Sequence, residues 1–287
     1  MDKSKNNLDD IQQALSEHGV VIVFNAALKV TYVNSQFSEL SQYTPEELSA
    51  KKLELLFDRH DSNLFQECVD EIKQEKVWKG ILPCLRKDEK KFWLKASIVP
   101  VKGEDGCIEK YITIATDITR QERIRLAMER LAIAASGIES YSLIVRALCD
   151  GLDARWAGLG ELINGGRQVQ VLSFWADGKR GDTFVYDLAG TPCSDVCTKE
   201  NPLVISNSVA ELYPEDQMLV DIGAKSYRGE PLQDEENNIF GILFVIDDKS
   251  VEEDVSERAL LRLASERAML EIRRERTRPD AASSHAR

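Results

Sequence analysis

Residues 79–115 read KGILPCLRKDEKKFWLKASIVPVKGEDGCIEKYITIA, and this stretch decides the fold of the first half of the chain. It contains three β-rich runs, over residues 79–85, 92–101 and 108–115. A charged turn at 86–90 separates the first two runs, and a loop with Gly103 and Gly106 separates the last two. Short turns between such runs predict strands that pair in antiparallel order.

The sequence before this stretch adds a hairpin and several helices. Residues 20–24 and 30–33 are two short β-rich runs joined by a turn, which predicts a β-hairpin. Asn34 has the place of a helix cap, Thr44 begins a capping box with Glu47, and residues 61–74 have an apolar stripe. Strands and helices do not alternate here as βαβ units. The order therefore predicts one antiparallel sheet with helices on one face.

The second half of the chain repeats this architecture without repeating the sequence. Asn164-Gly165-Gly166 is a strong hairpin turn between two β-rich runs. Strands are expected over residues 156–163, 168–175, 183–188, 203–206, 226–232 and 239–246, and short helices over 192–197 and 214–222. The fold class predicted for the whole chain is α+β, with two domains that are each a central antiparallel sheet with flanking helices.

Amphipathic helices are expected to connect and to end these domains, over about residues 119–136 and 252–276. The apolar residues of the first helix are spaced 4, 3, 4 and 3 apart, which is a heptad seam: Ile124, Met128, Leu131, Ala135 and Ile138. Such a seam predicts a left-handed pair of helices and hence a homodimer. The alternative is that the helix packs on its own domain.

Charge and composition limit the partners and the location of the chain. Its 287 residues include 37 Lys and Arg against 49 Asp and Glu, for a net charge of −12. This acidity argues against nucleic-acid binding, which needs a basic surface. No window approaches the roughly 18 apolar residues of a membrane span, and the first residues are polar. We therefore expect a cytoplasmic protein with no membrane contact.

The motifs of the first half resemble a PAS sensor domain over about residues 8 to 120. The ordered set that carries the resemblance is Asn34-x-x-Phe37, Tyr43-Thr44-Pro45-Glu46-Glu47-Leu48, Arg86-Lys87-Asp88, Pro100-Val101 and Asp117-Ile118-Thr119. The resemblance implies a ligand pocket with Asn34, Arg59, His60, Trp78 and Cys84. It also implies that Asp117, Ile118 and Thr119 couple the last strand to the helix that follows.

A flavin is one cofactor that this resemblance raises. Flavin-binding PAS domains have a basic Arg-His pair, here Arg59-His60, and then a Trp-x-Gly, here Trp78-Lys79-Gly80. The strand Asn of those domains is Cys84 in this chain, which removes an amide that could bond the edge of the ring. Two interpretations of Trp78 therefore stay open: its ring stacks on FAD bound in the first domain, or its ring fills the apolar core.

The second half resembles a GAF domain over about residues 138 to 250. The matching residues are Tyr186-Asp187-Leu188-Ala189-Gly190-Thr191-Pro192-Cys193, Tyr213-Pro214-Glu215-Asp216, Ser226-Tyr227-Arg228-Gly229-Glu230-Pro231-Leu232 and Phe240-Gly241-Ile242-Leu243. The resemblance implies a pocket near Cys193, Asp216, Tyr227 and Arg228. This domain has no histidine, which argues against bilin and haem, and the pattern of cyclic-nucleotide GAF domains is missing.

These observations predict a sensory or regulatory protein that is not an enzyme. The expected organisation is a PAS domain over 1–120, a signalling helix over 121–137, a GAF domain over 138–250, a C-terminal helix over 251–277 and a disordered tail over 278–287. A small ligand or a partner protein would bind, and dimeric helices would transmit the change to a separate output. Two alternatives stay open: an interaction and dimerisation scaffold without a ligand, and the sensor fragment of a diguanylate cyclase or histidine kinase. The polar tail is typical of a natural end, which disfavours the fragment.

Overall fold

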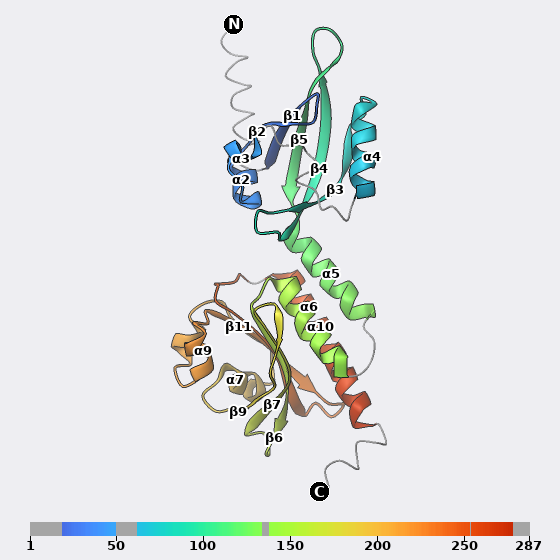
Figure 1. Cartoon of the computed structure of the whole chain (residues 1–287). Coiled ribbons are helices and arrows are strands. Elements are labelled where there is room, and N and C mark those ends of the chain that lie inside the picture. Colours follow the sequence, from blue (N-terminus) through green and yellow to red (C-terminus); the bar gives the residue numbers. More distant parts are fainter. Residues whose placement is uncertain (1–18, 50–61, 134–137, 253, 278–287) are drawn as a thin grey trace. The chain divides into compact units, whose positions relative to one another are not determined.

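A computed structural model describes residues 19–49, 62–133, 138–252 and 254–277 of the chain (Figure 1). The chain divides into two compact units, Met1–Thr119 and Arg120–Arg287. Each unit is built around one antiparallel sheet with helices against it, as the turn and strand signals predict. Within the described residues, no helix is both long and apolar enough to cross a membrane.

The first unit contains a five-stranded sheet in the order β2-β1-β5-β4-β3. Its strands are β1 (Val20–Asn25), β2 (Val30–Val33), β3 (Trp78–Leu85), β4 (Lys91–Lys102) and β5 (Ile108–Asp117). Its helices are α2 (Ser35–Ser41), α3 (Pro45–Leu48) and α4 (Ser62–Lys73). The predicted hairpin is confirmed, since Ile22 lies opposite Val33. The capping box at Thr44 is also confirmed, because its side chain accepts from the backbone of Glu47 and the Glu47 side chain accepts from the backbone of Thr44.

The second unit contains a seven-stranded sheet in the order β10-β11-β12-β6-β7-β8, with β9 also paired to β7. Its strands are β6 (Trp156–Ile163), β7 (Gln168–Ala176), β8 (Lys179–Gly181), β9 (Val185–Asp187), β10 (Leu203–Ile205), β11 (Ser226–Gln233) and β12 (Ile239–Asp247). The short helices are α7 (Pro192–Lys199), α8 (Val209–Leu212) and α9 (Gln217–Asp221). The predicted turn at 164–166 joins β6 to β7. Strand β8 and helix α8 were not expected from the sequence.

Two longer helices, α6 (Ile138–Leu152) and α10 (Val255–Arg276), lie against one face of this second sheet, and a third, α5 (Thr119–Ile133), packs beside them. They share one apolar cluster with the sheet. Gly151 of α6 marks their closest approach, because a Cβ atom there would lie 2.6 Å from Leu260 of α10 and 2.7 Å from Ala127 of α5. Only a glycine admits both neighbours at this distance.

The predicted dimer seam of α5 is used within the chain instead. Ile124 and Leu131 are buried, and Met128 packs beside them, all in the cluster that α6 and α10 complete. The physical reason is that a heptad spacing specifies an apolar face but not the helix that covers it. Ala135 and the side chain of Ile138 lie outside the described residues. The alternative weighed for this helix, packing on its own domain, fits the structure.

Candidate functional site

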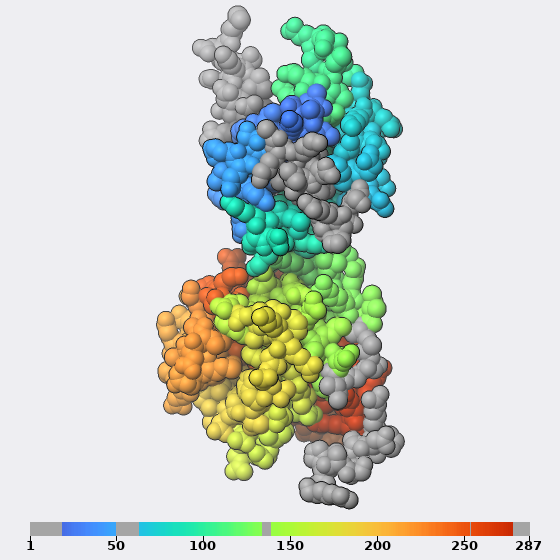
Figure 2. Space-filling model, viewed as in Figure 1, coloured from blue at the N-terminus to red at the C-terminus, as the bar shows by residue number. Residues whose placement is uncertain are grey.

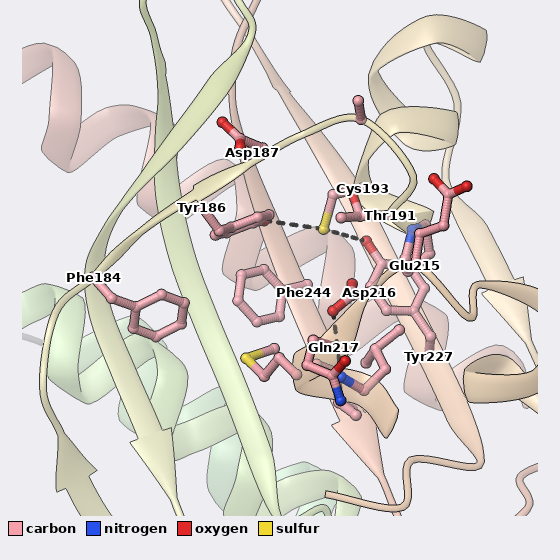
Figure 3. Close-up of a pocket in the computed structure, with 15 residues that line it drawn as sticks. Phe184, Tyr186, Asp187, Thr191, Cys193, Glu215, Asp216, Gln217, Tyr227 and Phe244 are labelled. Carbon is pink, nitrogen blue, oxygen red and sulfur yellow. Dashed lines mark hydrogen bonds between the residues drawn. The ribbon is translucent and has the colours of Figure 1, made fainter. Parts of the chain in front are cut away.

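A cavity of about 550 Å³ lies in the second unit, where one face of strands β11 and β12 meets the segments around β9, α7 and α9 (Figure 3). On the surface, the segment that holds β9 (yellow) and the one that holds α9 (orange) are neighbours (Figure 2). The cavity is lined by Phe184, Tyr186, Asp187, Ala189, Thr191, Pro192, Cys193, Glu215, Asp216, Gln217, Met218, Leu219, Tyr227, Phe244 and Ile246. Three of the four residues expected in this pocket from the sequence are among them: Cys193, Asp216 and Tyr227.

Aromatic rings form much of the wall. Phe184 and Tyr186 come from the β9 segment, with their ring centroids 6.1 Å apart, and Phe244 comes from β12. Phe244 lies directly opposite Gly158 of β6, where a Cβ atom would be 2.2 Å from its ring. Phe174 supports this wall from behind, edge-on to Phe184 at 5.4 Å. The glycine in the neighbouring strand therefore makes room for the central ring of the cavity, which Figure 3 shows between Tyr186 and Asp216.

Cys193 joins two tyrosines at one side of the cavity. The Tyr186 hydroxyl donates to the Cys193 sulfur at 3.1 Å, and the Tyr227 hydroxyl lies 3.2 Å from the same sulfur. Thr191 fixes the thiol at the start of α7 by capping that helix through the backbone of Ser194. Burial raises the pKa of the Cys193 thiol to about 12 despite these hydrogen bonds. The thiol is thus a neutral structural group rather than a reactive thiolate.

Three carboxylates lie at the same cavity. Asp216 caps α9 by accepting from the backbone of Leu219 at 3.3 Å, and Asp187 accepts from the Gln168 amide at 2.8 Å. Glu215 lies over Gly190, where a Cβ atom would be 2.8 Å from the carboxylate. Desolvation raises the pKa of Asp216, and hydrogen bonds from the backbone of α9 oppose this shift. Within the ranges that the structure describes, none of the three acids pairs with a lysine or arginine.

Arg228 does not line this cavity, which corrects the expectation from the sequence. Neighbouring residues of a strand point to opposite faces of the sheet, so Tyr227 and Arg228 cannot share one pocket. Arg228 points instead toward the helices, where its guanidinium donates to Glu257 of α10 at 2.6 Å. Both side chains are less than a tenth exposed.

Glu257 is the centre of a charged triad on that face. Its second oxygen accepts two hydrogen bonds from Arg120 of α5, at 2.8 and 3.0 Å. Asp254 caps α10 and places Glu257 in the first turn, where the helix dipole favours a carboxylate. A polar cavity of about 250 Å³ adjoins the triad, lined also by Asp153, Asp247 and Lys249 among others. The triad thus connects strand β11 to helices α5 and α10.

Three of the residues expected in the first pocket are described by the structure, namely Asn34, Trp78 and Cys84. Asn34 is buried, and its amide oxygen accepts from the backbone of Val21 at 3.1 Å and of Phe37 at 3.2 Å. Its amide nitrogen donates to the carbonyl of Gly19 at 2.7 Å. The side chain therefore ties β1 to the start of α2. Arg59 and His60 lie outside the described residues.

Trp78 and Cys84 belong to the apolar core of the first unit. The indole of Trp78 covers Gly80, where a Cβ atom would be 2.5 Å from the ring. Burial raises the pKa of Cys84, and its thiol lies 3.6 Å from the carbonyl of Leu82. The packing of Trp78 in the core fits the alternative in which its ring fills the domain, and neither Asn34, whose amide bonds to backbone groups, nor Cys84 offers an amide to a ring edge.

Asp117, Ile118 and Thr119 join the end of β5 to β4 through hydrogen bonds. Ile118 donates its backbone N–H to the carbonyl of Trp93 at 2.9 Å, and Thr119 accepts from the backbone of Trp93 at 3.1 Å. The carboxylate of Asp117 accepts from the backbone N–H of Thr119 at 2.9 Å and from its hydroxyl. The next residue is Arg120, which belongs to the triad.

Several residues of the site were missed from the sequence. In the sequence, Phe184 and Phe244 have the pattern of ordinary core residues in strands. This pattern does not distinguish an aromatic side chain that lines a cavity from one that packs in the core. Glu257 reads as a helix-start carboxylate. A signal did exist for the carboxylates, because Asp187, Glu215 and Asp216 stand in the motifs that carry the GAF resemblance.

Comparisons with known proteins agree with the two units. The family model of the PAS domain matches residues 17–120, and that of the GAF domain matches residues 136–272. The bacterioopsin transcriptional activator of Halobacterium salinarum is 25% identical over 150 residues, a match that covers 47% of this chain and 22% of that protein. The chain thus spans about a fifth of the length of this curated relative.

Solved structures that match the chain include a PAS domain from Colwellia psychrerythraea, with 21% identity and a TM-score of 0.37 over 39% of this chain and 98% of that one. They also include the phytochrome photosensory core module of Stigmatella aurantiaca, with 12% identity and a TM-score of 0.45 over 92% of this chain and 59% of that one. PAS and GAF domains are sensory and regulatory domains. The chain is a member of both families, with a PAS domain followed by a GAF domain.

Proposed function

We propose that this chain is a sensor whose GAF domain binds a small molecule in the 550 Å³ cavity and transmits its binding through helices α5 and α10. The observation that carries the proposal is the arrangement of strand β11. Tyr227 faces the cavity, and the next residue, Arg228, faces the helices and bonds to Glu257. A ligand that displaces Tyr227 also shifts the strand from which Arg228 extends.

The size and lining of the cavity support ligand binding. Ligand pockets in proteins have volumes of roughly 300–1,000 Å³, with mostly apolar walls and a few polar groups that orient the ligand. The volume of this cavity falls within that range, and its lining combines aromatic rings with carboxylates and the hydrogen-bonded thiol of Cys193.

The triad supports the transmission step. Glu257 bonds to Arg228 of β11 and to Arg120 of α5, so a shift of the strand alters the contacts of both helices. Arg120 follows Asp117-Ile118-Thr119, where the PAS domain ends. Ligand binding would then favour one of two packings of the helices, which is a shift of populations rather than a new fold. We further propose a homodimer in the cytoplasm, with output through a partner protein and no catalysis by this chain.

The experiment is to equilibrate the full chain with a small-molecule extract, remove unbound compounds, and analyse the protein after denaturation by mass spectrometry. We expect a retained molecule. Ala189→Trp should abolish retention, because Ala189 lines the cavity at its exposed rim and an indole there would block the opening, whereas Val185→Trp should keep it, because Val185 is also exposed but does not line the cavity. Equal retention by both variants would refute the cavity as the binding site.

The scaffold alternative makes the opposite prediction. A pure dimerisation protein would retain no molecule and would form a dimer in light scattering, whatever stands at position 189. The fragment alternative, a sensor part of a larger signalling enzyme, is compatible with the same cavity. It differs only in the output, which is carried by neighbouring sequence.

A further inference from the structure

The charged side chains that line the GAF cavity are all acidic. Its lining has three carboxylates, Asp187, Glu215 and Asp216, and includes no lysine, arginine or histidine. Within the described part of the chain, no cation of the protein compensates these acids through an ion pair. Each added negative charge at the cavity would therefore raise the electrostatic energy of the others.

The walls of the cavity are suited to a cation as well. Four aromatic rings face it, from Phe184, Tyr186, Tyr227 and Phe244. The face of an aromatic ring is electronegative and attracts ammonium groups, and sites for organic ammonium ligands are built from several such rings. Apolar residues such as Met218 and Ile246 would contact the uncharged part of a ligand.

The same lining disfavours anions. Recognition of phosphate or carboxylate groups depends on arginine, lysine or groups of backbone N–H donors. At the start of α9 the backbone N–H of Leu219 is already bonded to Asp216, and at the start of α7 that of Ser194 is bonded to Thr191. A phosphate, a nucleotide or a carboxylic acid in this cavity would lie beside the half-buried Asp216, with the exposed Asp187 and Glu215 at the rim, and the lining has no lysine or arginine to balance its charge.

From this combination of rings and unbalanced acids, we infer that the GAF cavity binds an organic cation, an aromatic or alkyl ammonium compound whose charged group lies by Asp216 and whose apolar body lies against Phe244 and Tyr186. The inference rests on the proposed function, because it names the ligand class of the same cavity. The size of the cavity, about 550 Å³, admits a ligand of two or more rings.

The test compares three probes of one shape: tryptamine, a cation; tryptophol, its neutral analogue; and indole-3-propionate, an anion. Binding to the full chain is measured by ligand-observed NMR or calorimetry at pH 7. We expect tryptamine to bind at least about fivefold more tightly than tryptophol and indole-3-propionate to bind weakest. Equal affinities, a preference for the anion, or no binding of tryptamine would overturn the inference.

Matched variants locate the charge. Asp216→Asn keeps the cap of α9, since Asn caps helices as well as Asp does, and removes only the charge. It should weaken tryptamine roughly tenfold and leave tryptophol unchanged. Asp221→Asn is the control, because Asp221 lies on the same short helix and does not line the cavity. Equal losses in both variants would overturn the assignment of the charged group to Asp216.

The two proposals fail separately. If the molecule retained from an extract is an anion or a neutral compound and Ala189→Trp removes it, then the cavity is a ligand site and only the cation class is wrong. If nothing is retained and no probe binds, the ligand-binding function itself is wrong.

Discussion

Removal of the Glu257 carboxylate tests whether the triad holds the GAF helices to the sheet. The side chains of Glu257 and Arg228 are 9% and 6% exposed, whereas that of Arg120 is 48% exposed. Glu257→Ala would leave the buried Arg228 guanidinium without its partner. Breaking a buried ion pair on one side costs about 3–5 kcal/mol of the free energy of unfolding. For a domain of this size that corresponds to a fall in Tm of roughly 6–20 °C.

Arg120→Ala is the matched control at the exposed end of the triad. Because Arg120 is half exposed, its loss should lower the free energy of unfolding by no more than about 1 kcal/mol. The double variant Arg228→Met, Glu257→Leu removes both buried charges and fills their space. It should recover most of the stability that Glu257→Ala loses, since a buried pair can be replaced by apolar residues at little cost.

The measurement is hydrogen exchange of the full chain, followed by mass spectrometry of peptides. Peptides from β11 and α10 should lose protection in Glu257→Ala, and peptides from β4 of the PAS domain serve as an internal control. If Glu257→Ala and Arg120→Ala have equal and small effects, then the triad is an ordinary surface ion pair and the coupling drawn from it is wrong. An unstable double variant would show that the arginine itself is needed for packing.

Three further predictions test the burial and packing of single groups. Because burial raises the pKa of the Cys193 thiol to about 12, brief alkylation at pH 8 should label exposed Cys107 and leave Cys193 unlabelled until the protein is unfolded, as peptide masses will show. Gly80→Ala should cost about 1–3 kcal/mol in urea unfolding, because the added methyl group meets the Trp78 ring, whereas Gly103→Ala should cost little. Burial raises the pKa of Glu230 from 4.5 to about 7, so the folded protein holds this proton more tightly and loses stability as the pH rises from about 4.5 to 7. Glu230→Gln should therefore raise Tm at pH 8 but not at pH 4, and an unchanged Tm at both would contradict the burial.

The parts of the fold that were predictable are those with local signals. Turns such as 164–166 and the capping box at Thr44 leave little choice of conformation, so the strands and helices beside them were predicted close to their observed bounds. Strand β8 is three residues of charged and glycine sequence at the edge of the sheet. It is a strand because β7 beside it offers hydrogen bonds, and no local pattern predicts that.

The candidate site was harder to predict because its residues depend on tertiary contacts. Cys193, Asp216 and Tyr227 were grouped correctly, but Arg228 was grouped with them despite being the neighbour of Tyr227 on a strand. The alternation of a strand already separates such a pair, so that error was avoidable from the sequence. The prediction that the apolar seam of α5 faces a second chain could not have been corrected from the sequence in the same way. An apolar face with heptad spacing fits a second chain or the chain's own helices equally well.

In the proposed mechanism, strand β11 both contacts the ligand and transmits its binding to the helices, and the residues packed around the strand explain why. Gly229 lies two residues after Tyr227 on the same face, where a Cβ atom would be 2.4 Å from the Tyr227 hydroxyl. The ring therefore lies along the strand and reaches Cys193, so a ligand that moves the ring acts directly on the backbone of β11. On the opposite face, Arg228 cannot swing away from Glu257 without leaving a buried charge unpaired. A shift of the strand is then passed on more readily by moving α10 than by breaking the ion pair, which makes α10 the helix whose position should report on the cavity.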